Sequence, residues 1–358
     1  MKTGAAVKAG GLPLRAARTS WLVRPRALLV TLGGLVALVL LMALNMRIGD
    51  IEMTVPQVLR AVVDSSGGDH FVVMELRLPR ALTGALVGAA LALAGAIIQS
   101  IARNPLASPE ILGVTTGASV AVVAGVVFSG SAAGGVSGLL ASVGIPALAV
   151  IGGLGGAALV YALAWRHGLD GFRLVLVGIG VAAVFTNVKY WLLTVGDVND
   201  TGRAMVWITG SLNGRGWEHV VPVALALAVL VPLTLLGTRS LNALRFGDDT
   251  VIALGVRMNL ARGLLILGAV MLSAAATASA GPVAFVALAS PQIALRMTRS
   301  AQPPLIASAV VGAVLITGAD LVARTAFAPT ELPVGVVTAV LGAPYLIYLL
   351  TRIRKGRT

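Results

Sequence analysis

Residues 80–102 read RALTGALVGAALALAGAIIQSIA, and this stretch decides the fold class. After Arg80 it contains no charged side chain, and Ala, Leu, Ile and Gly dominate it. A helix rises about 1.5 Å per residue, so about 20 apolar residues cross the roughly 30 Å hydrocarbon core of a bilayer. The stretch therefore predicts a membrane-spanning helix rather than the core of a soluble domain.

Similar apolar runs recur along the whole chain. Of its 358 residues, 57% are hydrophobic and 11% are charged, whereas soluble domains carry about 25% charged residues. We predict an all-α polytopic membrane protein surrounded by the lipid bilayer. A single transmembrane domain, 27–351, lies between a basic N-terminal tail, 1–26, and a basic C-terminal tail, 352–358. Its ten expected spans, the eighth of them short, are 27–46, 80–102, 109–129, 138–164, 173–194, 220–238, 261–279, 283–298, 304–323 and 334–351.

The formal net charge of +13 fits such a protein without a nucleic acid partner. Positive side chains collect in the cytoplasmic loops of membrane proteins. Ten spans place both termini on one side, and most Lys and Arg residues fall in the tails and in the loops assigned to that side. Most acidic residues fall on the other side, so we expect both termini in the cytoplasm.

The chain lacks the usual signs of catalysis. It has no cysteine, and its three histidines are scattered, so we expect no metal site. A phosphate-binding loop of the form Gly-x-x-x-x-Gly-Lys-Ser/Thr is absent, so ATP hydrolysis is not expected here. Nor does the chain carry the series of intramembrane carboxylates that ion-coupled carriers use. We expect no catalytic residue and no cofactor bound by this chain.

Small residues recur at helical spacing within the spans. Gly84, Gly88, Ala92 and Ala96 form one stripe, and Gly152 and Gly156 belong to another. In lipid, such stripes let helix backbones approach each other closely. We interpret them as packing surfaces.

Two arginines stand at the start of the second expected span, in Arg77-Leu78-Pro79-Arg80. Proline suits the first position of a helix, so Arg80 is expected at a helix N-terminus, where the macrodipole disfavours a cation. One interpretation is an acidic partner outside the membrane. The other is an interfacial arginine pair with a local mate such as Glu75.

Two further polar features need an explanation. Residues 240–260 form the longest internal loop on the expected cytoplasmic side, and they favour a short amphipathic helix that docks a soluble subunit over a plain solvated connector. Asp320 and Arg324, four residues apart near the outer end of the ninth span, are expected to pair.

Prolines interrupt the segment from Gly281-Pro282 to Ser290-Pro291-Gln292. A membrane allows a broken helix only where protein or a cavity receives the freed backbone groups. Broken helices often lie beside transport paths, and the alternative is a simple kink.

A series of ordered segments resembles the permease family of iron–siderophore, haem and vitamin B12 importers, which are type II ATP-binding-cassette (ABC) importers. The resemblance runs from about residue 30 to the C-terminus. The segments are 77–80 (RLPR), 88–95 (GAALALAG), 103–109 (RNPLASP), 112–117 (LGVTTG), 254–255 (LG), 281–286 (GPVAFV), 319–324 (ADLVAR), 331–338 (ELPVGVVT) and 341–344 (LGAP).

The resemblance implies a transport subunit, not an enzyme, in the inner membrane of a bacterium. Two permeases would form one pathway, two ATPases would use ATP and Mg below it, and an extracytoplasmic binding protein would deliver a ferric siderophore. By resemblance, the docking residues for that protein are Arg77, Arg80 and Arg324. The ATPase-coupling residues are Leu244, Gly247, Asp248, Asp249, Leu254 and Gly255. The gate or pathway residues are Asn104, Leu106, Gly171, Phe172, Pro282 and Pro291.

Residues Pro291-Gln292 stand where many family members have Pro-His. Together with Gly281-Pro282, this is similar to the ferric-enterobactin-type permeases, which work as pairs of different chains. We therefore expect a heterodimer with a second permease. Cobalamin or haem import within the same family and, more remotely, an ion-coupled secondary carrier are the alternatives to ferric siderophore import.

Overall fold

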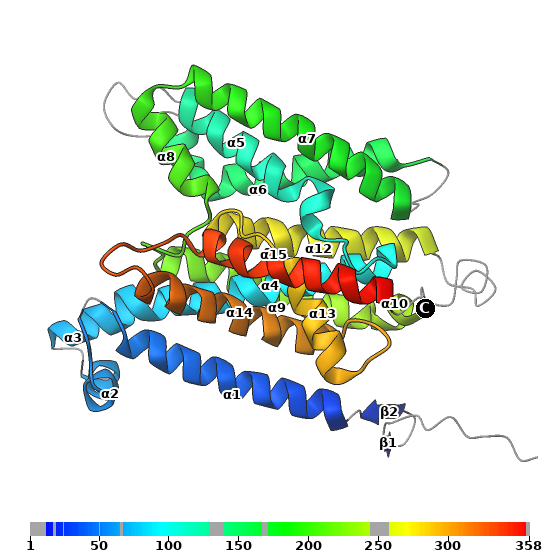
Figure 1. The fold of residues 1–358 in the computed structure, drawn as a ribbon, viewed down its shortest axis with the longest axis horizontal. Helices are drawn as coiled ribbons and strands as arrows, with labels where there is room; N and C mark the ends of the chain where they lie inside the picture. The colour runs from blue at the N-terminus through cyan, green and yellow to red at the C-terminus, as the bar shows by residue number, and fades with distance from the viewer. Residues whose placement is uncertain are drawn as a thin grey trace, which may run out of the picture.

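The computed structural model of the chain describes residues 12–16, 19–23, 25–49, 51–64, 67–128, 139–166, 171–243 and 258–355. These residues form an elongated helical bundle (Figure 1). One end, which we call the α2 end, carries α2 (Val55–Val63), α3 (Gly68–Phe71) and α8 (Val198–Ile208). The opposite end, which we call the α10 end, carries α10 (Thr238–Ala243) and the C-terminus.

The long helices run between these two ends. They are α1 (Pro25–Arg47), α4 (Leu78–Ala102), α5 (Val114–Phe128), α6 (Leu139–Ala164), α7 (Gly171–Val195), α9 (Trp217–Leu236), α12 (Met258–Ala280), α13 (Val286–Thr298), α14 (Leu305–Thr325) and α15 (Val334–Lys355).

Each of the ten expected spans coincides with one of these helices, which confirms the all-helical fold class. Within the described residues, seven helices are long and apolar enough to cross a membrane, and α5 is a shorter apolar helix. The eighth expected span is short, since α13 has 13 residues. The one β element described is a hairpin of β1 (Leu12–Ala16) and β2 (Thr19–Val23), which lies in the expected basic tail before α1.

The helix that contains the arginine pair begins earlier than predicted. A π-helical turn, η1 (Val72–Arg77), joins α3 to α4, so one continuous helix extends from Gly68 to Ala102. The N–H of Leu78 donates to the carbonyl of Val73, five residues earlier, and this wider turn accommodates Pro79 inside the helix. The expectation that Arg80 stands at a helix N-terminus is therefore wrong.

Helix α4 occupies the centre of the bundle. In its most apolar window, 83% of the residues are buried inside the protein, whereas none are in the corresponding window of α1. It packs against α14 through two glycines: a Cβ added to Gly88 would lie 2.2 Å from the carbonyl oxygen of Gly312, and the reverse substitution meets the same obstacle. The small-residue stripe of α4 is a packing surface, as its spacing predicts.

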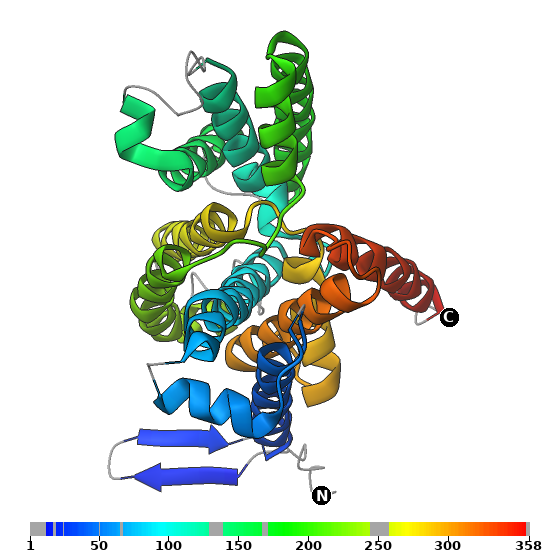
Figure 2. The ribbon, with the colours of Figure 1, turned by 90° about the vertical axis from the view of Figure 1, so that its left-hand side faces the viewer.

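Helices α5, α6, α7 and α8 form a second group, which lies beside α12 (Figure 2). Their own core contains Val122, Val123 and Trp207. Gly117 of α5 and Gly152 of α6 approach within van der Waals contact, because a Cβ on either would come within about 2.5 Å of the other's carbonyl oxygen. The second stripe is thus also a packing surface.

The chain between α12 and α13 is not helical, as the prolines predict. Residues 281–285 cross this gap, and Phe285 takes a left-handed backbone conformation at the start of α13, with φ at 66°. The Phe285 ring lies against Gly342 of α15, where a side chain would collide with it. The contact between Phe285 and Gly342 fixes the position of the backbone at the start of α13.

Candidate functional site

The three predicted docking arginines meet at one cavity at the α2 end. Its volume is about 370 Å³, and Arg77, Arg80 and Arg324 all line it. Arg77 and Arg80 come from the continuous helix, and Arg324 comes from the last turn of α14. Arg324 is far from Arg77 and Arg80 in the sequence, and the contact between α4 and α14 brings it close to them.

Arg80 is paired with acids of its own chain. Its guanidinium lies 2.9 Å from Asp320 of α14 and 2.9 Å from Glu331, in the turn before α15. Its side chain is 12% exposed and that of Asp320 is 3% exposed. The predicted local mate, Glu75, is not among the ion-pair partners that the structure shows for Arg80.

Arg77 is buried, and its guanidinium binds backbone carbonyls at the end of α1. Its guanidinium donates to the carbonyl of Met46 at 2.6 Å and also to the carbonyls of Arg47 and Ile51. The last carbonyls of a helix lack partners within it, and a cation there complements the macrodipole. Arg77 thereby ties α1 to the start of α4.

Arg324 forms the expected pair with Asp320, with Nε 3.7 Å from a carboxylate oxygen. Its Nη2 also donates to the side-chain oxygen of Asn45, a buried residue of α1. Asp320 therefore serves two arginines at once. The cluster joins α1, α4 and α14 through charge-assisted hydrogen bonds.

A further part of the lining of this cavity was not predicted from the sequence. It contains Arg215 and Glu218, from the turn between α8 and α9, together with Asn213 and Gly214. Burial lowers the pKa of the Arg215 guanidinium, and the nearby Glu218 carboxylate opposes that shift. The only sequence feature that could have indicated Arg215 is its position in a Gly-rich turn, on the expected outer side of the membrane, where acidic residues prevail.

The predicted gate residues do not form one cluster. Asn104 and Leu106 follow α4 at the α10 end, where the side chain of Asn104 accepts the N–H of Leu106 at 2.9 Å. Gly171 begins α7 at the same end, where a Cβ would lie 3.2 Å from Ala102. Phe172, beside it, is 79% exposed.

Pro282 and Pro291 lie elsewhere along the bundle. The carbonyl of Pro282 closely approaches Gly210, at the end of α8, so Pro282 lies towards the α2 end. Pro291 lies inside α13 and leaves the carbonyl of Ala287 without its helical N–H donor. That carbonyl packs directly against Gly95 of α4, where a Cβ would be 1.8 Å away.

Asn104 lines a cavity of about 320 Å³ at the α10 end, together with Gln99 and Gln292. The amide of Gln292 donates to the side-chain oxygen of Gln99 at 2.8 Å, and the amide of Gln99 donates to the carbonyl of Leu288 at 3.0 Å. Gln292, which follows Pro291 where a His was the more common expectation, therefore links α13 to α4 through its hydrogen bond to Gln99.

Glu110 was also missed by the sequence reasoning. It lies in η2 (Pro109–Leu112), where its carboxylate accepts the N–H of Phe285. Its Oε1 is buried and has no hydrogen-bond partner. This contact links the segment after α4 to the start of α13. In the part of the chain that the structure describes, no three His, Cys, Asp or Glu side chains gather to hold a metal ion.

The predicted coupling residues (Leu244, Gly247, Asp248, Asp249, Leu254 and Gly255) lie outside the described residues. The structure describes the helices that flank them: α10 ends at Ala243 and α12 begins at Met258, both at the α10 end.

A centrally packed helix, a broken helix beside it and polar cavities at both ends define a polytopic helical membrane permease. The model of the FecCD transport family matches residues 37–352, and the chain belongs to this family. It is a permease subunit of an ABC transporter, a system in which a separate subunit hydrolyses ATP.

Three relatives illustrate this membership. The ferric enterobactin transport system permease protein FepG of Escherichia coli (strain K12) is 42% identical over 86% of this chain and 90% of its own length. The iron(3+)-hydroxamate import system permease protein FhuG of Bacillus subtilis (strain 168) is 41% identical over 79% and 84%. The Fe(3+) dicitrate transport system permease protein FecD of E. coli (strain K12) is 40% identical over 81% and 88%.

A solved structure has the same fold. It is described as an inward-facing conformation of a metal-chelate type ABC transporter. The match has a TM-score of 0.77 and 28% sequence identity, and it covers 90% of this chain and 99% of the other.

Proposed function

We propose that this chain carries a ferric siderophore into the cytoplasm by alternating access, as one subunit of an ABC importer. The observation that carries the proposal is the likeness to relatives named for ferric enterobactin, iron(3+)-hydroxamate and Fe(3+) dicitrate transport. No bond of the cargo is made or broken, so the chain supplies a passage and its control rather than catalytic groups.

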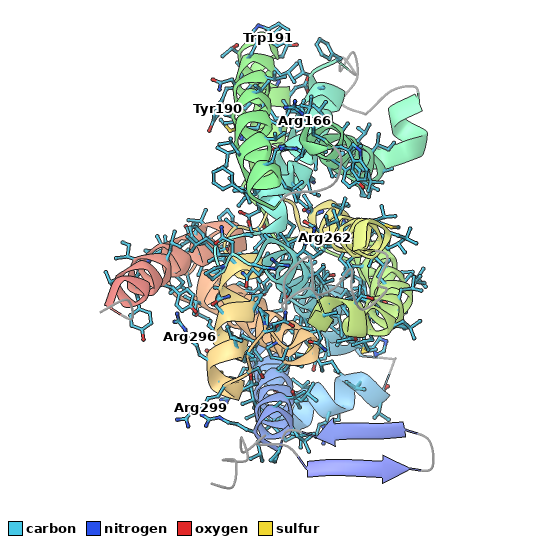
Figure 3. The ribbon with its side chains drawn as sticks, turned by 90° about the vertical axis from the view of Figure 1, so that its right-hand side faces the viewer. Arg166, Tyr190, Trp191, Arg262, Arg296 and Arg299 are labelled. Atoms are coloured by element: carbon cyan, nitrogen blue, oxygen red, sulfur yellow. The ribbon has the colours of Figure 1, made fainter. Side chains whose placement is uncertain are left out.

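The proposed orientation puts the α10 end in the cytoplasm and the α2 end outside. Arg166 follows the end of α6, Arg262 lies near the start of α12, and Arg296 and Arg299 lie at the end of α13 (labelled in Figure 3). These helix ends lie towards the α10 end (Figure 1). Acidic residues such as Asp69, Asp197 and Glu218 lie in elements at the α2 end. An excess of Lys and Arg marks the cytoplasmic side of a membrane protein. This orientation agrees with a location in the bacterial inner membrane with both termini inside.

Each end would then meet a different partner. The helices on either side of residues 244–257 end and begin at the α10 end, which supports docking of an ATPase there. The arginine-lined cavity at the α2 end supports docking of an extracytoplasmic binding protein that carries acidic residues, because complementary charge steers association and fixes register. We propose a second, different permease as the partner within the membrane and two ATPase subunits below.

Uptake of radioactive iron tests the proposed cargo. Cells that lack the gene and the same cells complemented with it receive a panel of ferric siderophores, with labelled cobalamin and haem in parallel. Loss of uptake of one ferric siderophore, restored by complementation, is the expected result. Normal iron uptake with loss of cobalamin or haem uptake would contradict the cargo but keep the importer.

A further inference from the structure

Three arginines gather where the start of α1 meets the end of α13, and we call Arg26, Arg296 and Arg299 the α13 basic patch. Arg26 is the second residue of α1, and its Nε donates to the carbonyl of Met297 in α13 at 2.8 Å. Arg296 lies in the last turn of α13, and Arg299 directly follows that helix. Figure 3 shows Arg296 and Arg299 on the outer side of α13, away from the centre of the bundle.

The α13 basic patch has no acidic partner in the part of the chain that the structure describes. None of its three guanidinium groups lies within 4.0 Å of a carboxylate there. Like charges held close together repel each other, most of all near a low-dielectric medium such as lipid. An anion from outside the chain would therefore be bound favourably at the patch.

The end of α13 does not need the side chains of Arg296 and Arg299 as caps. The N–H of Arg299 donates to the carbonyl of Arg296 at 3.3 Å, and the N–H of Ser300 donates to the carbonyl of Leu295 at 3.2 Å. Arg26 serves the carbonyl of Met297. Within the described residues, the guanidinium groups of Arg296 and Arg299 donate no hydrogen bond. Their N–H groups are thus available to a ligand.

Two tyrosines of α15 hold the guanidinium of Arg296. Its Cζ lies 5.8 Å from the ring centre of Tyr345 and 5.6 Å from that of Tyr348. Contact with aromatic rings orients a guanidinium and leaves its N–H edge available, and that edge suits two parallel hydrogen bonds to a phosphate. Tyrosines and cations side by side are also typical of the membrane–water interface.

The depth of the patch matches the headgroup layer of a bilayer. The apolar run 27–46 begins directly after Arg26, and the most apolar window of α1 has no residue buried inside the protein. Because Arg26 contacts Met297, the end of α13 lies at the same border of the hydrocarbon core. The flanking helices expose apolar side chains, such as Leu29 of α1 at 69% and Ile347 of α15 at 63%. A molecule with an anionic head and apolar chains fits both features.

We propose that the α13 basic patch binds the anionic headgroup of a membrane phospholipid. Arg296 and Arg299 donate to its phosphate, Arg26 adds positive potential, and the acyl chains lie along the apolar faces of α1 and α15. Basic sites between membrane helices bind anionic headgroups in this way. The inference depends neither on the cargo nor on which end of the bundle meets the binding protein.

The test titrates the complete transporter in detergent with phosphatidylglycerol, and separately with phosphatidylcholine that has the same acyl chains. Native mass spectrometry counts the bound lipids. We expect the wild type to bind phosphatidylglycerol at least about fivefold more tightly than phosphatidylcholine, and Arg296→Gln to raise the Kd for phosphatidylglycerol about fivefold. Arg299→Gln should act in the same direction, and Arg296→Lys should keep most of the affinity.

Arg166→Gln is the matched control. Arg166 is exposed after the end of α6, away from the patch, and its substitution makes the same change in charge (Figure 3). It should change the Kd by less than about twofold. Equal weakening by Arg166→Gln and Arg296→Gln would show a general charge effect and would overturn the proposal.

A second measurement separates lipid binding from a purely structural role of Arg296. Thermal unfolding of the complete transporter is followed in nanodiscs of phosphatidylglycerol and of phosphatidylcholine. We expect the wild type to be more stable in phosphatidylglycerol and Arg296→Gln to lose this difference. If Arg296 only packs against Tyr345 and Tyr348, its substitution lowers the unfolding temperature equally in both lipids, which would contradict lipid binding.

Two further outcomes would also overturn the proposal. Equal affinity of the wild type for both lipids would show that another subunit covers this face in the complete transporter. Displacement of phosphatidylglycerol by an equal concentration of inorganic phosphate would show that the patch binds a phosphate ion without any contribution from acyl chains.

Discussion

Asp320 is the residue on which the arginine cluster depends. Its carboxylate contacts Arg80 from α4 and Arg324 one turn further along α14. Its side chain is 3% exposed, so solvent screens these pairs little. Loss of this carboxylate leaves two buried guanidinium groups with fewer compensating charges, which is costly in a low-dielectric environment.

We expect Asp320→Ala to lower the free energy of unfolding by about 3–5 kcal/mol, the usual cost of breaking a buried ion pair from one side. Thermal unfolding of the purified protein in nanodiscs measures the change. Glu331→Ala is the matched control: it removes the second carboxylate of Arg80, but its side chain is 27% exposed, so the loss should be clearly smaller. Equal shifts for both variants would contradict a central role for Asp320.

At this scale, the sequence predicted which arginines matter but not what they contact. The pair of Asp320 and Arg324 followed from their spacing of four residues. The pairing of Arg80 with Glu331 did not, because those residues are distant in the chain and meet only through the packing of α14 against α4 and against α15. Arg215 was missed for the same reason, since its position in the cavity depends on where the turn before α9 is anchored.

The contact between α4 and α14 sets the geometry of the arginine cluster. Gly88 and Gly312 bring the two backbones so close that neither position has room for a Cβ. In a bilayer, such van der Waals contact is a principal source of helix association, because apolar burial contributes little.

We expect Gly88→Ala to destabilise the protein by about 1–3 kcal/mol or more, since the backbones must separate. The midpoint of thermal unfolding and the yield of the assembled transporter both report this change. Gly33→Ala on α1, where nothing lies within 4 Å of the added Cβ, should be neutral or slightly stabilising. A neutral result for Gly88→Ala would show that the two helices pack less closely than described.

The sequence predicted the long elements well and the short ones poorly. All ten apolar runs are helices, because hydropathy over some 20 residues is a strong signal. Helices α2, α8 and α10 were not predicted, since each is short and amphipathic or polar. The start of the helix that contains α4 was predicted too late in the sequence, because Pro79 was interpreted as a first helical position. A π-helical turn accommodates Pro79 within the helix.

The whole molecule carries its charge unevenly between its two ends, and this asymmetry underlies the proposed orientation. The chain contains no cysteine, so single introduced thiols report their own accessibility without a background.

We expect an impermeant maleimide to label Asn213→Cys in intact cells, because Asn213 is exposed beside the cavity at the α2 end. Ala301→Cys, exposed at the α10 end, should be labelled only after the membrane is permeabilised. Labelling of both variants in permeabilised cells is the control for reactivity. The opposite pattern in intact cells would reverse the orientation and remove the basis for docking of the binding protein at the α2 end.

The central position of α4 also has a consequence for how the protein is made. A ribosome delivers α4 early, whereas α12, α13 and α14, which surround it, emerge only after α5 to α9. During that interval the nascent α4 has lipid or insertion factors as its neighbours. Its high hydropathy makes the helix compatible with these apolar surroundings before its protein neighbours are inserted. Arg80 enters the membrane before Asp320 and Glu331 have been translated. The ion pairs of the arginine cluster therefore form only after α14 and the turn before α15 have been made.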